Sequence, residues 1–150
     1  MSATAELIKA EIEQANPVLA GKPRWHGLPD PSETPDLFRL NGIRPKQREN
    51  GAVYRDGVVN ECCVLSAILV NRTTTHELHA TAPNGVIRSR ERADILGLPI
   101  EFSDGAQDGF DGAPLYHGED YSPDYRDGHA YGKACLEACK AAGLMDEEPA

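Results

Sequence analysis

The amino-acid sequence predicts an α+β domain organised around one buried helix. Three observations lead to this prediction: one long segment is apolar at nearly every position, a second helical pattern lies near the end, and turn dipeptides separate short extended segments. At 150 residues the chain is long enough to bury a substantial core. We expect a single domain over 1–150, in which 1–35 form an N-terminal helix and a proline-rich arm and 36–145 form the core.

The first 35 residues divide into a helix and an arm. Apolar residues at helical spacing predict an amphipathic helix from Thr4 to Ala15. Asn16 and Pro17 end it, because the residue before a proline avoids helical backbone. Prolines at positions 17, 23, 29, 31 and 35 exclude further helix or sheet ladders. We expect this arm to run extended over the surface, with Trp25 anchoring it to the core.

The segment before the apolar run predicts a short helix and a small β-element. A hydroxyl, a proline and an acid over Thr34–Asp36 are typical of a helix start, and Gly42 is a typical helix end. Ala52–Arg55 lies between the turn dipeptides Asn50-Gly51 and Asp56-Gly57, which favours a short strand.

The central apolar run extends from Asn60 to Asn71. A run that is apolar all round fits either a buried helix of about ten residues or a buried strand. We favour the helix, because Ser66 and Ala67 interrupt the β-branched residues and Asn60 is a good N-cap. The adjacent Cys62 and Cys63 are then expected to be buried.

Three elements are predicted between this run and residue 128. Alternating residues around Asn84-Gly85 predict a hairpin of two short antiparallel strands, His76–Ala80 and Val86–Arg88. Ser89 and Gly97 bracket a short helix. Residues 101–128 are rich in Gly, Asp, Tyr and Pro, and they predict a long acidic surface loop.

The last element is a helix from about Gly128 to Ala142, with Asp127 as its N-cap and Gly143 at its end. One face carries mostly small side chains: Tyr131, Ala134, Cys135, Ala138, Cys139 and Ala142. Small side chains let a second helix approach closely. We therefore expect this helix to pack against the central one.

The charge of the chain narrows the class of partner. Its 24 acids and 15 bases give a formal net charge of −9, which disfavours nucleic acid and anionic membrane surfaces. No apolar stretch approaches the roughly 20 residues that span a bilayer, and no signal-peptide pattern opens the chain. We expect a cytoplasmic protein with reduced cysteines and a protein partner, and we expect neither a membrane nor a nucleic-acid partner.

The acidic tract from Glu101 to Asp127 is the candidate binding surface. Its aromatic residues supply contact area and its acids steer a basic protein patch toward it. The alternative is a solvated loop whose aromatic residues hold it to the core. The acids lack the spacing of a calcium loop, and no C-x-x-C pair occurs, so we predict no metal site and no cofactor. The candidate binding residues are Asp104, Asp108, Phe110, Asp111, Tyr116, Asp120 and Tyr121.

A thiol at the start of the central helix is the candidate nucleophile, because a helix N-terminus stabilises a thiolate. Cys62–Ala67 resembles the papain-type segment Cys-Trp-Ala-Phe-Ser-Ala, and Gly128–Ala130 resembles the papain-type His-Ala. The resemblance implies a thiol-dependent enzyme that uses Cys62 or Cys63 together with His129. The chain departs from that pattern, because no glutamine precedes the cysteines at the family distance and the two motifs stand closer than in the family.

A broader pattern resembles a loose group of small, functionally uncharacterised phage and bacterial proteins with a Cys-Cys-Leu-Gly-type central helix. It comprises Leu40–Gly42, Gln47, Gly51, Cys62–Ala67, Leu96–Leu98 and Arg126-Asp127. The resemblance implies a phage origin and hence the host cytoplasm. We expect a small phage-type accessory protein that binds another macromolecule, such as a host or defence protein. A papain-like enzyme and a structural component of a virion or assembly are the alternatives.

Overall fold

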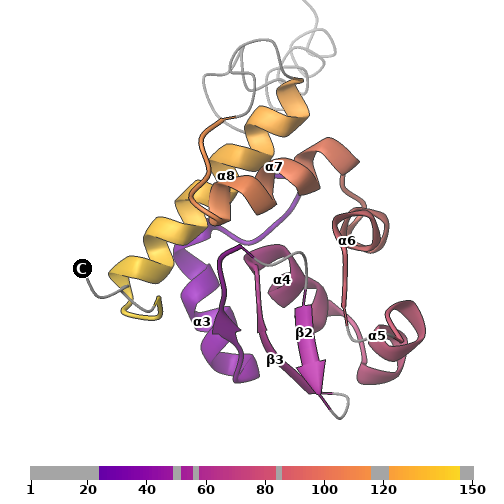
Figure 1. The fold of residues 1–150 in the computed structure, drawn as a ribbon. Helices are drawn as coiled ribbons and strands as arrows, with labels where there is room; N and C mark the ends of the chain where they lie inside the picture. The colour runs from indigo at the N-terminus through magenta and orange to yellow at the C-terminus, as the bar shows by residue number, and fades with distance from the viewer. Residues whose placement is uncertain (1–23, 49–51, 56–57, 84–85, 116–121, 146–150) are drawn as a thin grey trace, which may run out of the picture.

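The computed structural model describes residues 24–48, 52–55, 58–83, 86–115 and 122–145. Most of this part of the chain is helical, and a small sheet lies to one side of the helices (Figure 1). The amphipathic helix predicted over 4–15 lies outside the described residues. The elements are η1 (Pro31–Glu33), α3 (Thr34–Asn41), β1 (Arg44–Pro45), β2 (Ala52–Arg55), β3 (Val58–Cys62), α4 (Val64–Arg72), α5 (Thr75–Thr81), α6 (Ser89–Leu96), α7 (Ile100–Phe110) and α8 (Pro123–Ala141).

The two short helices predicted from capping residues are present. α3 ends at Gly42 and α6 ends at Gly97, and both glycines adopt left-handed backbone. The strand predicted over Ala52–Arg55 is also present as β2. In these cases the residues that start or stop the element lie next to it in the sequence.

The apolar central run divides into a strand and a helix. Val58–Cys62 forms β3, and Cys63 has extended backbone and is the N-cap of α4. The prediction that the helix begins at Asn60 is therefore wrong, because the residues before Cys63 pair with neighbouring strands. Every side chain from Val64 to Leu69 is buried, so the predicted buried central helix is correct over its remaining length.

β3 is the middle strand of a three-stranded sheet with the order β1-β3-β2. It pairs parallel with β1 and antiparallel with β2. Glu61 on β3 accepts hydrogen bonds from Arg44 (3.1 Å) and Lys46 (2.8 Å), and the Lys46 bond is the main reason that the pKa of Glu61 is lowered. Glu61 thus pairs with two basic residues that lie beside it on the sheet.

The hairpin predicted around Asn84-Gly85 is wrong. Its first strand is the helix α5, whose N-cap Thr74 accepts a hydrogen bond from the backbone N–H of Glu77 at 3.1 Å. Thr74 and Glu77 have the spacing of a capping box. This helix-start pattern outweighs the alternation of His76–Ala80, which had favoured a strand.

The long loop predicted over 101–128 is also wrong, because Ile100–Phe110 forms α7 and Pro123 already belongs to α8. Phe102, Ala106 and Phe110 are spaced four residues apart and bury one face of α7. Gly105 and Gly109 had suggested turns. In the structure they lie on the face that meets α8.

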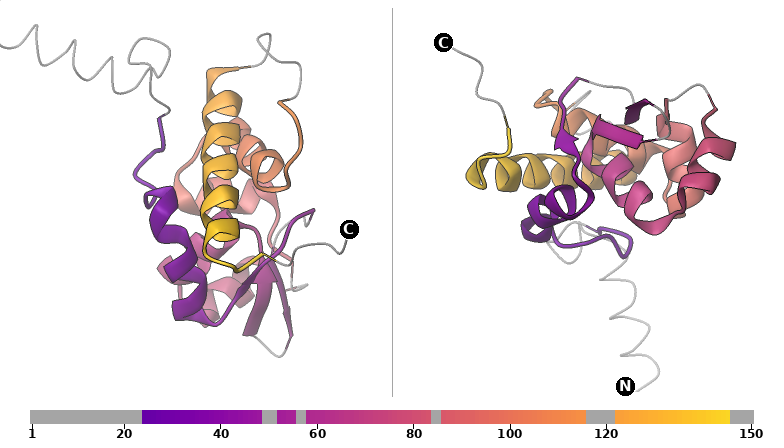
Figure 2. Two further views of the ribbon diagram at one scale, coloured as in Figure 1. Left: turned by 90° about the vertical axis from the view of Figure 1, so that its left-hand side faces the viewer. Right: turned by 90° about the horizontal axis from the view of Figure 1, so that it is seen from below.

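α7, rather than the central helix α4, is the main partner of α8. Gly128 lies against the backbone of Phe102, and Gly132 lies against the backbone of Ala106. Residue numbers rise together along the contact, so the two helices run in roughly the same direction. Figure 2 shows α8 along the length of the molecule, with α3 and α7 on either side of it.

Candidate functional site

The acidic stripe of α7, defined as Glu101, Asp104, Asp108 and Asp111, is the first candidate site. The spacing of these acids places them along one face of the helix. Glu101 and Asp104 are exposed, whereas Asp108 and Asp111 are half-buried. Because α7 is a helix, three candidate binding residues that the sequence placed in a loop share one surface.

The hydrogen bonds to this stripe come from groups that carry no charge. The Ser89 hydroxyl donates to Asp104 at 2.6 Å, and the Tyr125 hydroxyl donates to Asp108 at 2.6 Å. Asp111 accepts from the Gln107 amide at 3.0 and 3.1 Å and from the backbone N–H of Arg48. Within the described ranges none of the four acids forms an ion pair.

A buried arginine lies behind the stripe. Arg92 is fully buried and donates to the carbonyl of Ile87 (3.0 Å) and to the side-chain oxygen of Gln107 (2.9 Å). The amide of Gln107 then donates to Asp111, so Gln107 links the guanidinium to the carboxylate. Burial raises the pKa of Asp111 despite these contacts. The network joins α6 to α7.

The remaining candidate binding residues do not extend the stripe. Phe110 is completely buried and stacks on Phe38 with ring centroids 6.3 Å apart, so its assignment to a binding surface is wrong. It belongs to the apolar side of α7. Tyr116, Asp120 and Tyr121 lie outside the described residues.

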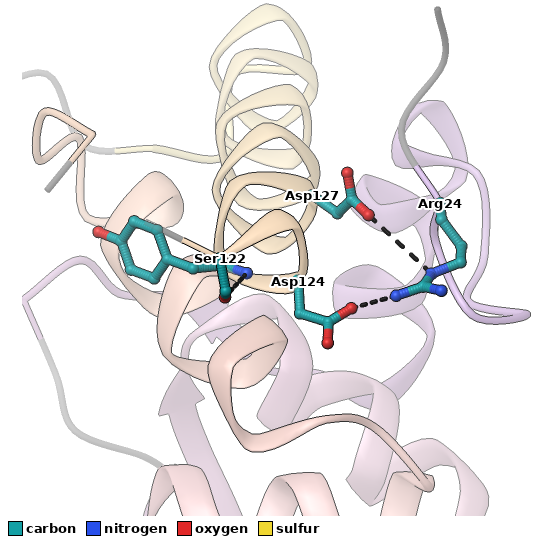
Figure 3. Close-up of polar contacts among 5 residues, drawn as sticks. Arg24, Ser122, Asp124 and Asp127 are labelled. Carbon is teal, nitrogen blue, oxygen red and sulfur yellow. Dashed lines mark hydrogen bonds and ion pairs between the residues drawn. The ribbon is translucent and has the colours of Figure 1, made fainter. Parts of the chain in front are cut away.

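The second candidate site lies where the arm, defined as residues 24–33, meets the first turns of α8 (Figure 3). Arg24 forms ion pairs with Asp124 and, at 4.0 Å, with Asp127. Ser122 caps α8 by accepting from the backbone N–H of Tyr125 at 3.2 Å. The prediction that Asp127 is the N-cap is therefore wrong, because Asp127 lies within α8, and its side chain is buried.

Burial dominates the electrostatics of this second site. It raises the pKa of Asp127 to about 6, although the nearby Arg24 lowers it. It also lowers the pKa of His26, and Arg24 adds to that effect. Within the described part of the chain, four buried polar atoms here have no hydrogen-bond partner: Arg24 Nε, Trp25 Nε1, His26 Nε2 and Asp127 Oδ2.

Aromatic contacts hold the arm against α7 and α8. Trp25 packs edge-on against Tyr131 of α8 at 5.5 Å, and His26 packs edge-on against Phe102 of α7 at 4.9 Å. The prediction that Trp25 anchors the arm to the core is confirmed. The sequence reasoning missed the partners of Arg24. The helix-start pattern Ser122-Pro123-Asp124, which resembles the start of α3, would have placed Asp124 and Asp127 on α8.

Both cysteines of the candidate thiol site are buried. Cys62 and Cys63 are 0% and 1% exposed, as predicted, and burial raises the pKa of Cys62 well above its usual value. The Sγ of Cys63 lies 3.6 Å from the Ser66 hydroxyl. The Nε2 of His129 is 2.7 Å from the carbonyl of Ala113 instead. Buried thiols pack as small apolar side chains, and this geometry favours that role.

The same holds for the two cysteines of α8, because burial raises the pKa of Cys135 to about 12 and that of Cys139 to about 11. Among the residues whose positions are described, no three His, Cys, Asp or Glu side chains are grouped so that they could hold a metal ion. In the same ranges no helix combines the length and the apolar character that a membrane crossing requires.

Comparisons with known proteins assign neither a family nor a function to this chain. No protein-family model, no curated protein and no solved structure matches this chain.

Proposed function

We propose that the protein is a small accessory protein of the phage type that binds another protein through the acidic stripe of α7. The partner presents a basic patch. The observation that supports this proposal is the set of four acids on one helix face, which form no ion pair in the described part of the chain.

Like charges three or four residues apart destabilise a helix by about 0.2–0.5 kcal/mol per pair. Asp108 lies close enough to Asp111 to raise its pKa, although burial of Asp111 contributes more. A basic partner relieves this repulsion when it binds. The net charge of −9 draws such a partner toward the protein before contact.

The test uses the double variant Asp104→Asn, Asp108→Asn. Asparagine keeps an oxygen that accepts the hydrogen bonds from Ser89 and Tyr125, so the fold is retained while two charges are lost. The matched control is Glu77→Gln, Glu137→Gln, which removes the same charge from exposed residues of α5 and α8. The partner is captured from bacterial lysate with the unmodified protein and identified by mass spectrometry.

Association of the purified partner is then measured with each variant at low and at high salt. We expect the stripe variant to lose about tenfold in on-rate at low salt, and we expect this loss to shrink as salt screens the charges. The control variant should change much less. Equal on-rates for the stripe and control variants at low salt would exclude the acidic stripe as the interface.

A further inference from the structure

The arm covers the beginning of α7 and part of α8 through a small set of contacts. Besides the aromatic contacts and the Arg24 ion pairs, the Tyr131 hydroxyl donates to the carbonyl of Pro29 at 2.7 Å. Arg72 donates to the carbonyl of Gly27 at 3.2 Å. The arm is thus held on the core by polar groups, by two rings and by the buried side chains of Leu28 and Pro31.

Two titratable groups become buried where the arm docks. Asp127 is 4% exposed, and the Nε2 atom of His26 is buried with no hydrogen-bond partner in the described chain. Removal from water penalises the charged form of each group. The carboxyl group of Asp127 therefore holds a proton more readily when the arm is docked. The imidazole of His26 holds one less readily.

We propose that docking of the arm on α7 and α8 is linked to protons with opposite signs, through uptake on Asp127 and release from His26. The two effects oppose each other in the intact protein. Losing either group exposes the pH dependence of the other.

The pKa directions agree with this geometry. The pKa of Asp127 rises from 3.8 to about 6 on burial, so its contribution to docking is largest in acid and is lost as the pH rises through 6. The pKa of His26 falls below 6.5, so its contribution is present above 6.5 and is lost as the pH falls.

The charged groups near these two residues are few. Arg24 comes from the arm, and Asp124 and Arg126 come from α8. From α7 the contact is Phe102, which carries no charge, and Glu101 is exposed to solvent. Asp127 and His26 are therefore the groups whose burial links docking to protons.

Hydrogen exchange measured by mass spectrometry tests the proposal on the full chain. The protection of a peptide covering 24–33 is compared at about pH 5 and about pH 7.5, after correction for the pH dependence of chemical exchange. A peptide from α8 covering 131–139 serves as the internal reference for global stability. The variants are His26→Asn, Asp127→Asn and the double variant. Asparagine suits position 26 because His26 has a φ of 50°, which asparagine tolerates well.

The arm of His26→Asn should gain about tenfold in protection from about pH 7.5 to about pH 5, since a carboxyl pKa of about 6 predicts that change. The arm of Asp127→Asn should lose protection over the same range, and the double variant should show neither slope. Asp124→Asn, which weakens the pairing of Arg24, should lower protection to a similar extent at both values.

Slopes of the same sign in the two single variants would overturn the proposal. It would also fail if the α8 peptide changed in parallel with the arm, because the titration would then act on global stability. No partner is used in this experiment, so its outcome is independent of the binding function proposed for α7.

Discussion

Replacing Gly128 with alanine tests the close backbone contact between α7 and α8. The Cβ atom of an alanine at this position would lie 2.8 Å from the carbonyl carbon and 2.9 Å from the Cα of Phe102, and even closer to the carbonyl oxygen. All three atoms are main chain, so no side-chain rotation relieves the overlap. α7 and α8 must move apart.

Two effects of opposite sign set the size of the change. Overpacking a well-packed contact costs about 1–3 kcal/mol, and sometimes more. Alanine in place of glycine inside a helix regains about 1 kcal/mol. Because the overlap is with backbone and Gly105, Gly109 and Gly132 extend the same contact, we place the overpacking cost at about 3 kcal/mol. The net loss in the free energy of unfolding is then about 2 kcal/mol.

Urea unfolding followed by far-UV circular dichroism measures this loss. With an m value of about 2 kcal/mol per molar urea, the midpoint should fall by about 1 M. Lys133→Ala is the matched control, because Lys133 is an exposed residue of the same helix, and its midpoint should change little. A midpoint for Gly128→Ala at or above that of the unmodified protein would refute the backbone contact, since helix propensity alone would then decide the outcome.

Two further predictions concern the core. Arg92→Met should destabilise the protein by about 3 kcal/mol, because the buried carbonyl of Ile87 and the buried side-chain oxygen of Gln107 each lose a charged donor. Arg90→Met, an exposed neighbour on α6, should leave the urea midpoint nearly unchanged. Cys62 and Cys63 should remain unmodified by iodoacetamide in the native protein and react fully in urea, as seen by mass spectrometry of the peptides. Rapid labelling of either cysteine in the native protein would contradict their burial. It would support the alternative that one of them acts as a nucleophile.

Asp127 beneath the arm and the acids of the stripe are each costly to the fold, but for different reasons. Asp127 is buried where its charge is penalised, whereas the acids of the stripe are exposed or half-buried and lie close to one another. Residues that are costly to the isolated fold are often found at functional sites. We therefore expect substitutions at these positions to affect binding or arm docking more than they affect the fold.

The candidate site was only partly accessible from the sequence. Asp104, Asp108 and Asp111 were recognised as acids of one tract, but they form a surface only because α7 is a helix. Phe110 lies in the same stretch of sequence as these acids, yet it faces the core because of its position on the helix. Arg24 and Asp124 are separated by 100 positions, and no local pattern connects them.

Elements whose start and stop residues are local could be predicted from the sequence. The ends of α3 and α6 at Gly42 and Gly97, the burial of Val64–Leu69 and the anchoring role of Trp25 follow from capping, backbone preference and apolar content. Only the tertiary structure decided that Gly105 and Gly109 lie inside a helix. Glycine costs a helix about 1 kcal/mol locally. The close backbone contact with Gly128 and Gly132 offsets that cost, and this contact forms only when α7 and α8 pack together.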